Sequence, residues 1–395
     1  MRNKFNIKKY FYVIILIICT PQWINAQYPV ITHGPYLQYL TSEEVTICWS
    51  TSKNCISWVE YYEEDGSNFY QKEREKTFDA TDGLKNIGKL HSVTIKNLNP
   101  ATKYAYRIYS KEVKDDRSFG NTASTRVYGR KPLYFATQPI EKEQTSIIVL
   151  SDMHEKSAKV GSLLKGIEWE KIDFVLLNGD FMDSFELESD LYEGVLDTIV
   201  DVFAKEKPLV IVRGNHETRG RKAPELKDYF HFPENKFYYT YTIGTTMFIV
   251  LDSGEDKADS DIEYYGFADF DSYRSEQAKW LSEVVKSEAF RKAEHKIAFM
   301  HIPPYDNYPG REWHGDLEVR NKFVPILNQA GIDLMVCGHT HNYSYHAPKD
   351  GKNNFPIIIS GSRSRINLTI DKTSIKATRV GMDSKEISSI FIKKK

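Results

Sequence analysis

The stretch IIVLSDMH, residues 147–154, decides the fold of the larger part of this 395-residue chain. Its four consecutive apolar residues, Ile147–Leu150, are typical of a strand that is buried on both faces of an α/β domain. An acidic residue, Asp152, and an imidazole, His154, follow where that strand ends. Loops at the carboxyl ends of such strands converge on one crevice, where α/β domains build their sites. The stretch therefore predicts a buried strand with a functional site at its end.

The same layout recurs along the rest of the chain. The further short apolar runs are Phe174–Leu177, Leu209–Val212, Phe248–Leu251, Ile297–Met300, Leu334–Val336 and Ile357–Ile359. Segments with a helical spacing of apolar residues separate several of them, including 187–203 and 277–285. Alternating strands and helices predict buried strands with helices packed on the outside.

Side chains that bind metals follow five of these runs. They are Asp152, His154, Asp180, Asn215, His301, His339 and His341. Mixed oxygen and nitrogen donors suit first-row transition metals better than calcium or magnesium. Seven ligands exceed what one ion takes but suit two ions that share a carboxylate, so we expect two ions of Fe, Zn or Mn.

Local geometry explains part of the spacing. In Asp152-x-His154, an extended two-residue step is expected to turn both side chains to one side, and His339-x-His341 repeats the pattern. Glycines at 179, 214 and 338 are expected to allow sharp exits from the strands.

The N-terminal part of the chain has a different pattern. Val45, Ile47 and Trp49 alternate with polar residues, which predicts short strands of an antiparallel β-sandwich. The segment 98–104 places Tyr104 after a Pro-containing turn, the layout of a tyrosine corner, and this part resembles a fibronectin type III domain. The stretch 34–38 also resembles the opening of the N-terminal domain of purple acid phosphatases. A polar stretch, 138–145, separates two predicted domains, 27–137 and 143–395.

In order, the motifs are Asp-x-His, Gly-Asp-x-x-Asp, Gly-Asn-His-Glu, His and Gly-His-x-His. This set resembles the signature of the calcineurin-like metallophosphoesterase superfamily over residues 146–365. The resemblance implies an α/β sandwich of two central mixed β-sheets flanked by helices. It also implies ligand roles: Asp152, His154 and His341 for one metal, Asn215, His301 and His339 for the other, and Asp180 as the bridge.

The resemblance also implies a general acid. His216, which follows the amide ligand, is placed to protonate the leaving oxygen. Asp183 matches a carboxylate that orients this histidine in related protein phosphatases, or it caps a helix before Ser184. Purple acid phosphatases carry a tyrosine at the position of Asp183 and lack a histidine at that of His154, so their purple colour should be missing here.

Other residues have candidate supporting roles. His314 and Arg311, downstream of His301, are candidate contacts to substrate phosphate. Arg213 either points to the pocket or ends its strand, and Glu217 is expected to support its loop. Ser184 stands where protein phosphatases have an arginine, which disfavours a protein substrate.

The first 26 residues have the layout of an export signal. Four basic residues precede the apolar run 11–19, and a small residue, Ala26, precedes the expected cleavage point. Anchoring through a lipid on Cys19 is disfavoured by the bulky Ile18. We expect a protein exported to the periplasm or the medium, without a transmembrane span after cleavage. Cleavage also removes Cys19. The remaining cysteines fit either a disulfide bridge between Cys48 and Cys55 or free buried thiols.

Charge excludes one class of function. The chain has 53 basic and 54 acidic residues, and loss of residues 1–26 would leave 49 against 54. Such a balance disfavours a protein that wraps nucleic acid.

These observations predict an exported phosphomonoesterase that acts on small phosphate esters by in-line attack of a metal-bridging hydroxide. A phosphodiesterase with the same two-metal core is the first alternative. The second is an inert, phosphoesterase-fold binding protein that attaches through its β-sandwich.

Overall fold

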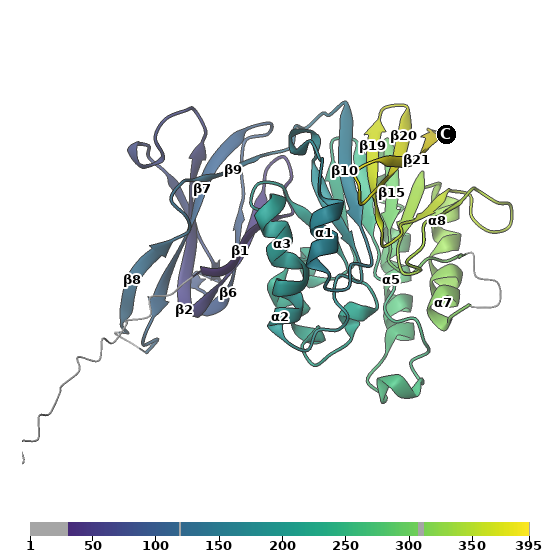
Figure 1. Cartoon of the computed structure of the whole chain (residues 1–395), viewed down its shortest axis with the longest axis horizontal. Helices are drawn as coiled ribbons and strands as arrows, with labels where there is room; N and C mark the ends of the chain where they lie inside the picture. Colours follow the sequence, from purple (N-terminus) through teal and green to yellow (C-terminus); the bar gives the residue numbers. More distant parts are fainter. Residues whose placement is uncertain (1–30, 118–119, 307–311, 395) are drawn as a thin grey trace, which may run out of the picture.

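The structure is a computed structural model that describes residues 31–117, 120–306 and 312–394 (Figure 1). A β-sandwich is followed by a larger layered α/β part. The predicted export signal with Cys19, and also Arg311, lie outside the described residues. Among the described residues, no helix combines the length and the apolar character that crossing a bilayer needs.

The sandwich is built from antiparallel strand pairs. Its strands are β1 Ile31–Gln38, β2 Val45–Glu63, β3 Glu75–Phe78, β4 Ala80–Thr81, β5 Leu84–Lys85, β6 Gly88–Ile95, β7 Lys103–Val113, β8 Thr122–Val127 and β9 Leu133–Ala136. A short 3₁₀ turn, η1 Phe69–Gln71, follows β2. The alternating residues Val45, Ile47 and Trp49 are buried in the sandwich core, as predicted. The Asn99 N–H donates to the Tyr104 hydroxyl at 2.9 Å, which confirms the tyrosine corner.

Two mixed sheets form the centre of the α/β part. The first contains β10 Gln144–Leu150, β11 Phe174–Asn178, β12 Leu209–Val212, β19 Ser364–Asp371, β20 Ser374–Gly381 and β21 Glu386–Lys393. The second contains β13 Tyr239–Ile243, β14 Thr246–Val250, β15 His295–Phe299, β16 Leu334–Cys337, β17 Ser344–His346 and β18 Ile357–Ile359. Each predicted apolar run contributes to one of these strands, which confirms the predicted pair of mixed sheets.

Helices cover the outer faces of both sheets. In Figure 1, α1–α3 lie towards the sandwich, whereas α5, α7 and α8 lie on the opposite side. The α-helices and π-helical segments are α1 Ser157–Leu163, α2 Glu188–Leu191, η3 Tyr192–Leu196, α3 Asp197–Ile199, η4 Val200–Ala204, α4 Leu226–Tyr229, α5 Phe270–Val284, α6 Glu288–Lys292, α7 His314–Lys322 and α8 Val324–Ala330. The 3₁₀ turns of this part are η2 Trp169–Lys171, η5 His216–Thr218, η6 Ala223–Glu225, η7 Pro233–Asn235 and η8 Ile262–Tyr264. The helix predicted over 187–203 is thus present, with two π-helical stretches inside it.

The sandwich joins the α/β part through β1. Gln38 pairs with Leu209 of β12 in parallel, so that one sheet, with 13 strands among the described residues, runs through both parts. The buried Tyr36 belongs to the hydrophobic core of the α/β part. Cys48 and Cys55 are buried and unbridged, in agreement with the free-thiol alternative. The domain limits at 137 and 143 stay predictions.

Candidate metal centre

The metal-binding side chains predicted from the sequence meet at the carboxyl ends of five strands. Two groups of donor atoms form, each within 4.8 Å: one of Asp152, His154, Asp180 and His341, and one of Asp180, His301 and His339. The carboxylate of Asp180 is common to both groups. The amide oxygen of Asn215 lies 3.0 Å from His339 Nδ1 and so joins the second group. This arrangement suits two ions that share one carboxylate.

The backbone turns that present these side chains are left-handed, not extended. Asp152, His154, Asp180, His339 and His341 all have positive φ, between 50° and 72°. The expectation of an extended step in Asp152-x-His154 and His339-x-His341 is therefore wrong. Left-handed conformations are unfavourable for residues with a Cβ and concentrate at functional sites. Here they let successive loop residues turn back towards one point above the strand ends.

Glycines allow the loops to approach each other. Gly179 has φ of +80°, and a Cβ there would lie 2.3 Å from His301 Nδ1. A Cβ on Gly338 would lie 2.0 Å from Ser151 Oγ. Gly179 supplies the predicted sharp exit, whereas Gly338 is needed for close packing between neighbouring loops.

Hydrogen bonds fix which nitrogen of two imidazoles faces the centre. His301 Nδ1 lies 2.8 Å from the Asn178 carbonyl, and His154 Nδ1 lies 2.7 Å from a carboxylate oxygen of Asp183. Both partners only accept, so each Nδ1 donates a hydrogen and each Nε2 is the nitrogen that can bind a metal once it has no proton. His154 Nε2 lies 3.0 Å from Nε2 of His341. An imidazole whose far nitrogen is held in this way is typical of a metal ligand.

Two buried atoms of the cluster have no hydrogen-bond partner. They are Asp152 Oδ1 and His301 Nε2, although the latter lies only 3.0 Å from an Asp180 oxygen. A buried polar atom without a partner is costly, and a cation bound by each donor group would satisfy the unpaired atom of that group. The donor set and these unpaired atoms therefore fit a pair of metal ions.

The electrostatics of the cluster support the same conclusion. Burial raises the pKa of Asp152 to about 7, because an ionised carboxylate without a cation beside it is unfavourable at this buried position. Burial also opposes a charge on His301, but the carboxylates of Asp180 and Asp152 outweigh it and raise the pKa of His301 to about 10. Burial lowers the pKa of His339 to about 3, which keeps that ring neutral, as a metal ligand must be. The carboxylates thus attract positive charge to this point of the fold.

Glu217 holds the loop that follows β12, as predicted. Its side chain is buried and accepts three backbone N–H groups, those of Asp180 and Gly214 at 2.8 Å and that of Met182 at 3.0 Å. These bonds join the loop after β11 to the loop after β12. Glu217 therefore sets the distance between the candidate ligands Asp180 and Asn215.

His216 stands at the edge of the cluster. Its Nε2 lies 3.9 Å from an Asp180 oxygen, and its Nδ1 lies 2.7 Å from the backbone carbonyl of Asp183. A carbonyl only accepts, so Nδ1 carries the hydrogen and Nε2 is the atom that exchanges a proton. The prediction that the Asp183 carboxylate orients His216 is wrong: the carboxylate contacts His154 and the carbonyl contacts His216. The alternative role as a helix cap is not seen either, since α2 begins later, at Glu188.

Sequence reasoning missed Arg219. Its guanidinium Nη1 lies 3.3 Å from His216 Nε2. The Nε and Nη2 atoms donate to the two carboxylate oxygens of buried Glu255, both at 2.8 Å. The motif Gly-Asn-His-Glu ends two residues earlier, and Glu255 lies 36 residues away, so no local pattern connects the pair. A fork-to-fork contact of this kind fixes the guanidinium in one place.

Of the two predicted phosphate contacts, only His314 lies among the described residues, and its contact in the structure is with a carboxylate. His314 is the first residue of α7, and its Nε2 lies 2.8 Å from a carboxylate oxygen of Asp271 in α5, not against the ligand cluster. Its role in the structure is to tie α7 to α5. Arg213 lies 2.6 Å from an oxygen of buried Asp252 and stacks on Phe237. Arg213 directly follows the last residue of β12 and lines a cavity that contains none of the candidate metal ligands, so its role at the metal centre stays a prediction.

Comparison with known proteins agrees with the site. A family model described as calcineurin-like phosphoesterase matches residues 145–343, just over half of the chain. The chain belongs to the calcineurin-like phosphoesterase family. A second model, the N-terminal domain of purple acid phosphatase, matches residues 33–126.

Relatives of known sequence match about two thirds to three quarters of this family member. An uncharacterised protein of Mycobacterium tuberculosis is 26% identical over 293 residues, which cover 67% of this chain and 52% of that protein. Purple acid phosphatase 18 of Arabidopsis thaliana is 23% identical over 317 residues, 76% of this chain and 63% of the relative. The chain thus spans between half and two thirds of these relatives.

The fold of this family member also matches a solved structure. Purple acid phosphatase PPD1 from yellow lupin seeds superposes with a TM-score of 0.68 at 16% identity, covering 93% of this chain and 74% of that one. The similarity confirms the predicted fold class, a sandwich followed by a calcineurin-like α/β part.

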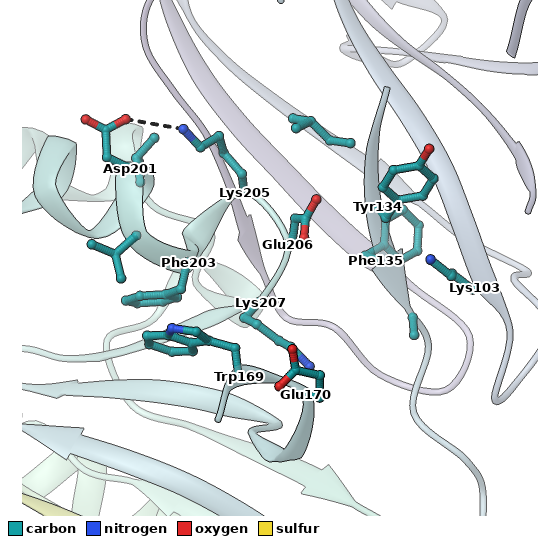
Figure 2. A pocket seen from close by; sticks show the side chains of 14 residues that line it. Lys103, Tyr134, Phe135, Trp169, Glu170, Asp201, Phe203, Lys205, Glu206 and Lys207 are labelled. Carbon is teal, nitrogen blue, oxygen red and sulfur yellow. Dashed lines mark hydrogen bonds and ion pairs between the residues drawn. The ribbon is translucent and has the colours of Figure 1, made fainter. Parts of the chain in front are cut away.

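A separate cavity of about 560 Å³ lies at the junction of the two parts (Figure 2). Trp169 and Phe203 stack on its α/β side with ring centroids 5.0 Å apart, and Tyr134 of β9 lines the sandwich side. None of the candidate ligands lines it, so this cavity is distinct from the metal centre.

Proposed function

We propose that this chain hydrolyses phosphate esters with a pair of metal ions, and that phosphomonoesters are its substrates. The observation that carries the proposal is the pair of donor groups that share Asp180, with His216 Nε2 3.9 Å from that same carboxylate. Family membership and the purple acid phosphatase relatives support it.

Residues of the chain hold the metals in this proposal. Asp152, His154 and His341 hold one ion, Asn215, His301 and His339 hold the other, and Asp180 contacts both. When bound, such a pair of ions makes a water molecule acidic enough to ionise near neutral pH and withdraws charge from the phosphate oxygens.

Proton transfer is assigned to His216. The acid is the doubly protonated ring: Nδ1–H stays on the Asp183 carbonyl, the Nε2 proton passes to the departing oxygen, and a neutral imidazole is left. Arg219, fixed by Glu255, stands beside this nitrogen with Nη1 placed to donate a hydrogen bond where the ester oxygen leaves.

Metal analysis paired with a small ester panel tests the proposal. The purified chain is loaded with Mn²⁺, Zn²⁺ or Fe and assayed with p-nitrophenyl phosphate and with bis(p-nitrophenyl) phosphate. We expect two metal ions per chain and faster turnover of the monoester. Faster turnover of the bis ester would identify a phosphodiesterase. No turnover of either ester with any metal would leave the inert binding protein as the better description.

A variant separates metal binding from folding. Asp180→Asn removes the shared carboxylate charge and should lower metal content to one ion or fewer per chain. Asp201→Asn, on the exposed face of η4, is the control and should keep the full content. Equal metal content in both variants would contradict the shared-carboxylate arrangement.

We also propose that residues 1–26 direct export and are then removed. The basic start, the apolar run and Ala26 support this. N-terminal sequencing of the protein recovered from the periplasm or the medium should begin at Gln27. Recovery of an intact N-terminus from the cytoplasm would contradict the proposal.

A further inference from the structure

A cavity of about 860 Å³ lies next to the candidate general acid. Thr218 and Arg219, which directly follow the Gly-Asn-His-Glu motif, form one of its walls. Arg219 Nη1 lies 3.3 Å from His216 Nε2, so the cavity begins where the ester oxygen receives its proton. None of the candidate metal ligands lines this cavity.

The cavity carries excess positive charge. Four cationic side chains and two anionic ones line it. Arg213 and Arg219 are paired with buried carboxylates. The side chains of Arg221 and Lys227 form no ion pair among the described residues. The Arg221 Nε donates to the Glu186 carbonyl, the Arg221 backbone N–H donates to the Glu186 carboxylate, and the Lys227 ammonium lies over Phe237. Two cations without an ion pair in a concave surface favour an anionic ligand, although the whole chain is almost neutral.

An exposed aromatic side chain stands at the rim. Phe267 lines the cavity and is 93% exposed, on a segment where Ile262 and Tyr265 are also more than 80% exposed. The ring of Phe237, deeper in the wall, is already covered by Arg213 at 3.9 Å and by Lys227 at 4.8 Å. Phe267 therefore offers the open ring face, and a planar group that stacked on it would remove apolar surface from water.

We propose that this cavity is the subsite for the leaving group. It takes a leaving group with a planar ring and a second negative charge, which lies against Phe267 with its anion between Arg221 and Lys227. The inference rests on the proposed hydrolysis, because His216 protonates the leaving oxygen and the remainder of that group then extends past Arg219. The substrate class is thus an aryl or heteroaryl phosphate ester with a further acidic group.

Binding of the leaving group alone tests the subsite without turnover. The probe is fluorescent 6-hydroxynaphthalene-2-sulfonate, and 2-naphthol, which lacks the sulfonate, is its neutral counterpart. Both are titrated against the full metal-loaded chain. We expect the sulfonate to bind at least about fivefold more tightly, because two cations face its charge. Equal or weaker binding of the sulfonate would overturn the proposal.

Two variants locate the bound probe. The double variant Arg221→Ala/Lys227→Ala should weaken sulfonate binding about fivefold and leave 2-naphthol binding unchanged. Phe267→Ala should weaken both ligands by a similar factor, because it removes the ring but no charge. Arg130→Ala/Lys131→Ala, in an exposed sandwich loop, and Phe391→Ala, exposed on β21, are the matched controls. If a control variant lost as much probe affinity as the cavity variant that it matches, the probe would bind elsewhere and the proposal would be overturned.

Kinetics separate this inference from the proposed function. For 6-sulfo-2-naphthyl phosphate, kcat/KM should exceed that for 2-naphthyl phosphate, and the double variant should abolish the difference. Turnover of both esters without a preference, together with absent probe binding, would refute the subsite and leave the hydrolase standing. Specific probe binding without turnover of any ester would refute the hydrolase and leave a ligand site.

Discussion

At the scale of single residues, the site depends on which nitrogen of each imidazole is hydrogen-bonded to the protein, because the other nitrogen is then left to act in the site. The Asp183 carbonyl holds Nδ1 of His216, whereas its carboxylate holds Nδ1 of His154. One loop residue therefore fixes the ring of the candidate acid and the ring of a candidate metal ligand. The two rings stand edge to face, with centroids 4.8 Å apart. A change at Asp183 is expected to disturb both.

Replacing His216 by alanine should reduce turnover and leave the metals in place. Loss of a general acid costs about 10²–10⁴-fold in kcat, with the larger loss for an alkyl phosphate, whose leaving oxygen needs the proton more than p-nitrophenolate does. Steady-state kinetics with both esters and metal analysis of the same samples give the result. His314→Ala is the matched control, because His314 pairs with Asp271. Equal losses for the two esters, or lost metal, would argue against the acid role.

The absence of a tyrosine at position 183 predicts the colour of the iron-loaded protein. A purple band arises from a tyrosinate bound to ferric iron, and here a carboxylate 2.7 Å from His154 Nδ1 stands at that position. Iron-loaded chain with confirmed metal content should have no intense visible band in that region. An intense band would show that a phenolate from elsewhere in the chain binds the iron.

Glu217 is expected to be essential for the shape of the site. Glu217→Gln turns an acceptor oxygen into an amide that faces backbone N–H donors, so the free energy of unfolding should fall by about 1–3 kcal/mol. Metal affinity should fall by about 10–100-fold, as for other groups that position ligands. Urea denaturation and competitive metal titration measure the two effects. The control is Glu225→Gln, at an exposed ion pair with Lys222, which should change the free energy of unfolding and the metal affinity only slightly. Equal losses in the Glu217 and Glu225 variants would contradict this role of Glu217.

At the scale of elements, the sequence predicted the strands of the α/β part and the order of the ligands after them. Continuous apolar runs as short as Phe174–Leu177 are typical of buried strands, and the polar residues after them therefore indicated the site. The left-handed turns at Asp152 and His339 were not predictable, because neither residue type signals positive φ in the way that glycine does. The pairing of Arg219 with Glu255 depends on tertiary packing between distant loops and leaves no local pattern.

The start of α7 contains a buried acid whose pKa is shifted. Asp316 accepts from the Trp313 N–H at 3.0 Å, and burial raises its pKa to about 7. The folded state therefore binds this proton more tightly than the unfolded state, whose Asp pKa is about 3.9. The stabilisation is complete below pH 4 and is lost as the pH rises from about 4 to 7, with a size of about 2–4 kcal/mol.

Asp316→Asn tests this pH dependence. Asparagine keeps an acceptor for the Trp313 N–H but cannot ionise, so the variant should lose less stability than the parent between pH 4 and 8. Denaturant unfolding of both proteins across that range measures the difference in slope. Asp82→Asn, in an exposed sandwich turn, is the control and should follow the parent. Parallel curves for Asp316→Asn and the parent would contradict the shifted pKa.

At the scale of the whole molecule, the sandwich and the α/β part share structure, so we expect them to unfold together. Gln38 pairs with Leu209 in the common sheet, and its side-chain oxygen accepts from the His231 N–H at 2.8 Å. The hydroxyl of Tyr241 donates to the Leu40 carbonyl at 2.5 Å. Tyr36 packs in the core of the α/β part, so separating the two parts would expose apolar surface on both.

Calorimetry should therefore show one transition for the whole chain, with equal calorimetric and van't Hoff enthalpies. Gln38→Ala leaves the partly buried His231 N–H without its acceptor, at a cost of about 1 kcal/mol, and should lower the temperature of that single transition. The control Gln144→Ala, at an exposed position of β10, should leave the temperature of the unfolding transition unchanged. If the two parts were independent, Gln38→Ala would split the transition or move only one of two peaks. A single shifted peak would instead show that contacts made by β1 stabilise the sheet that carries the metal centre.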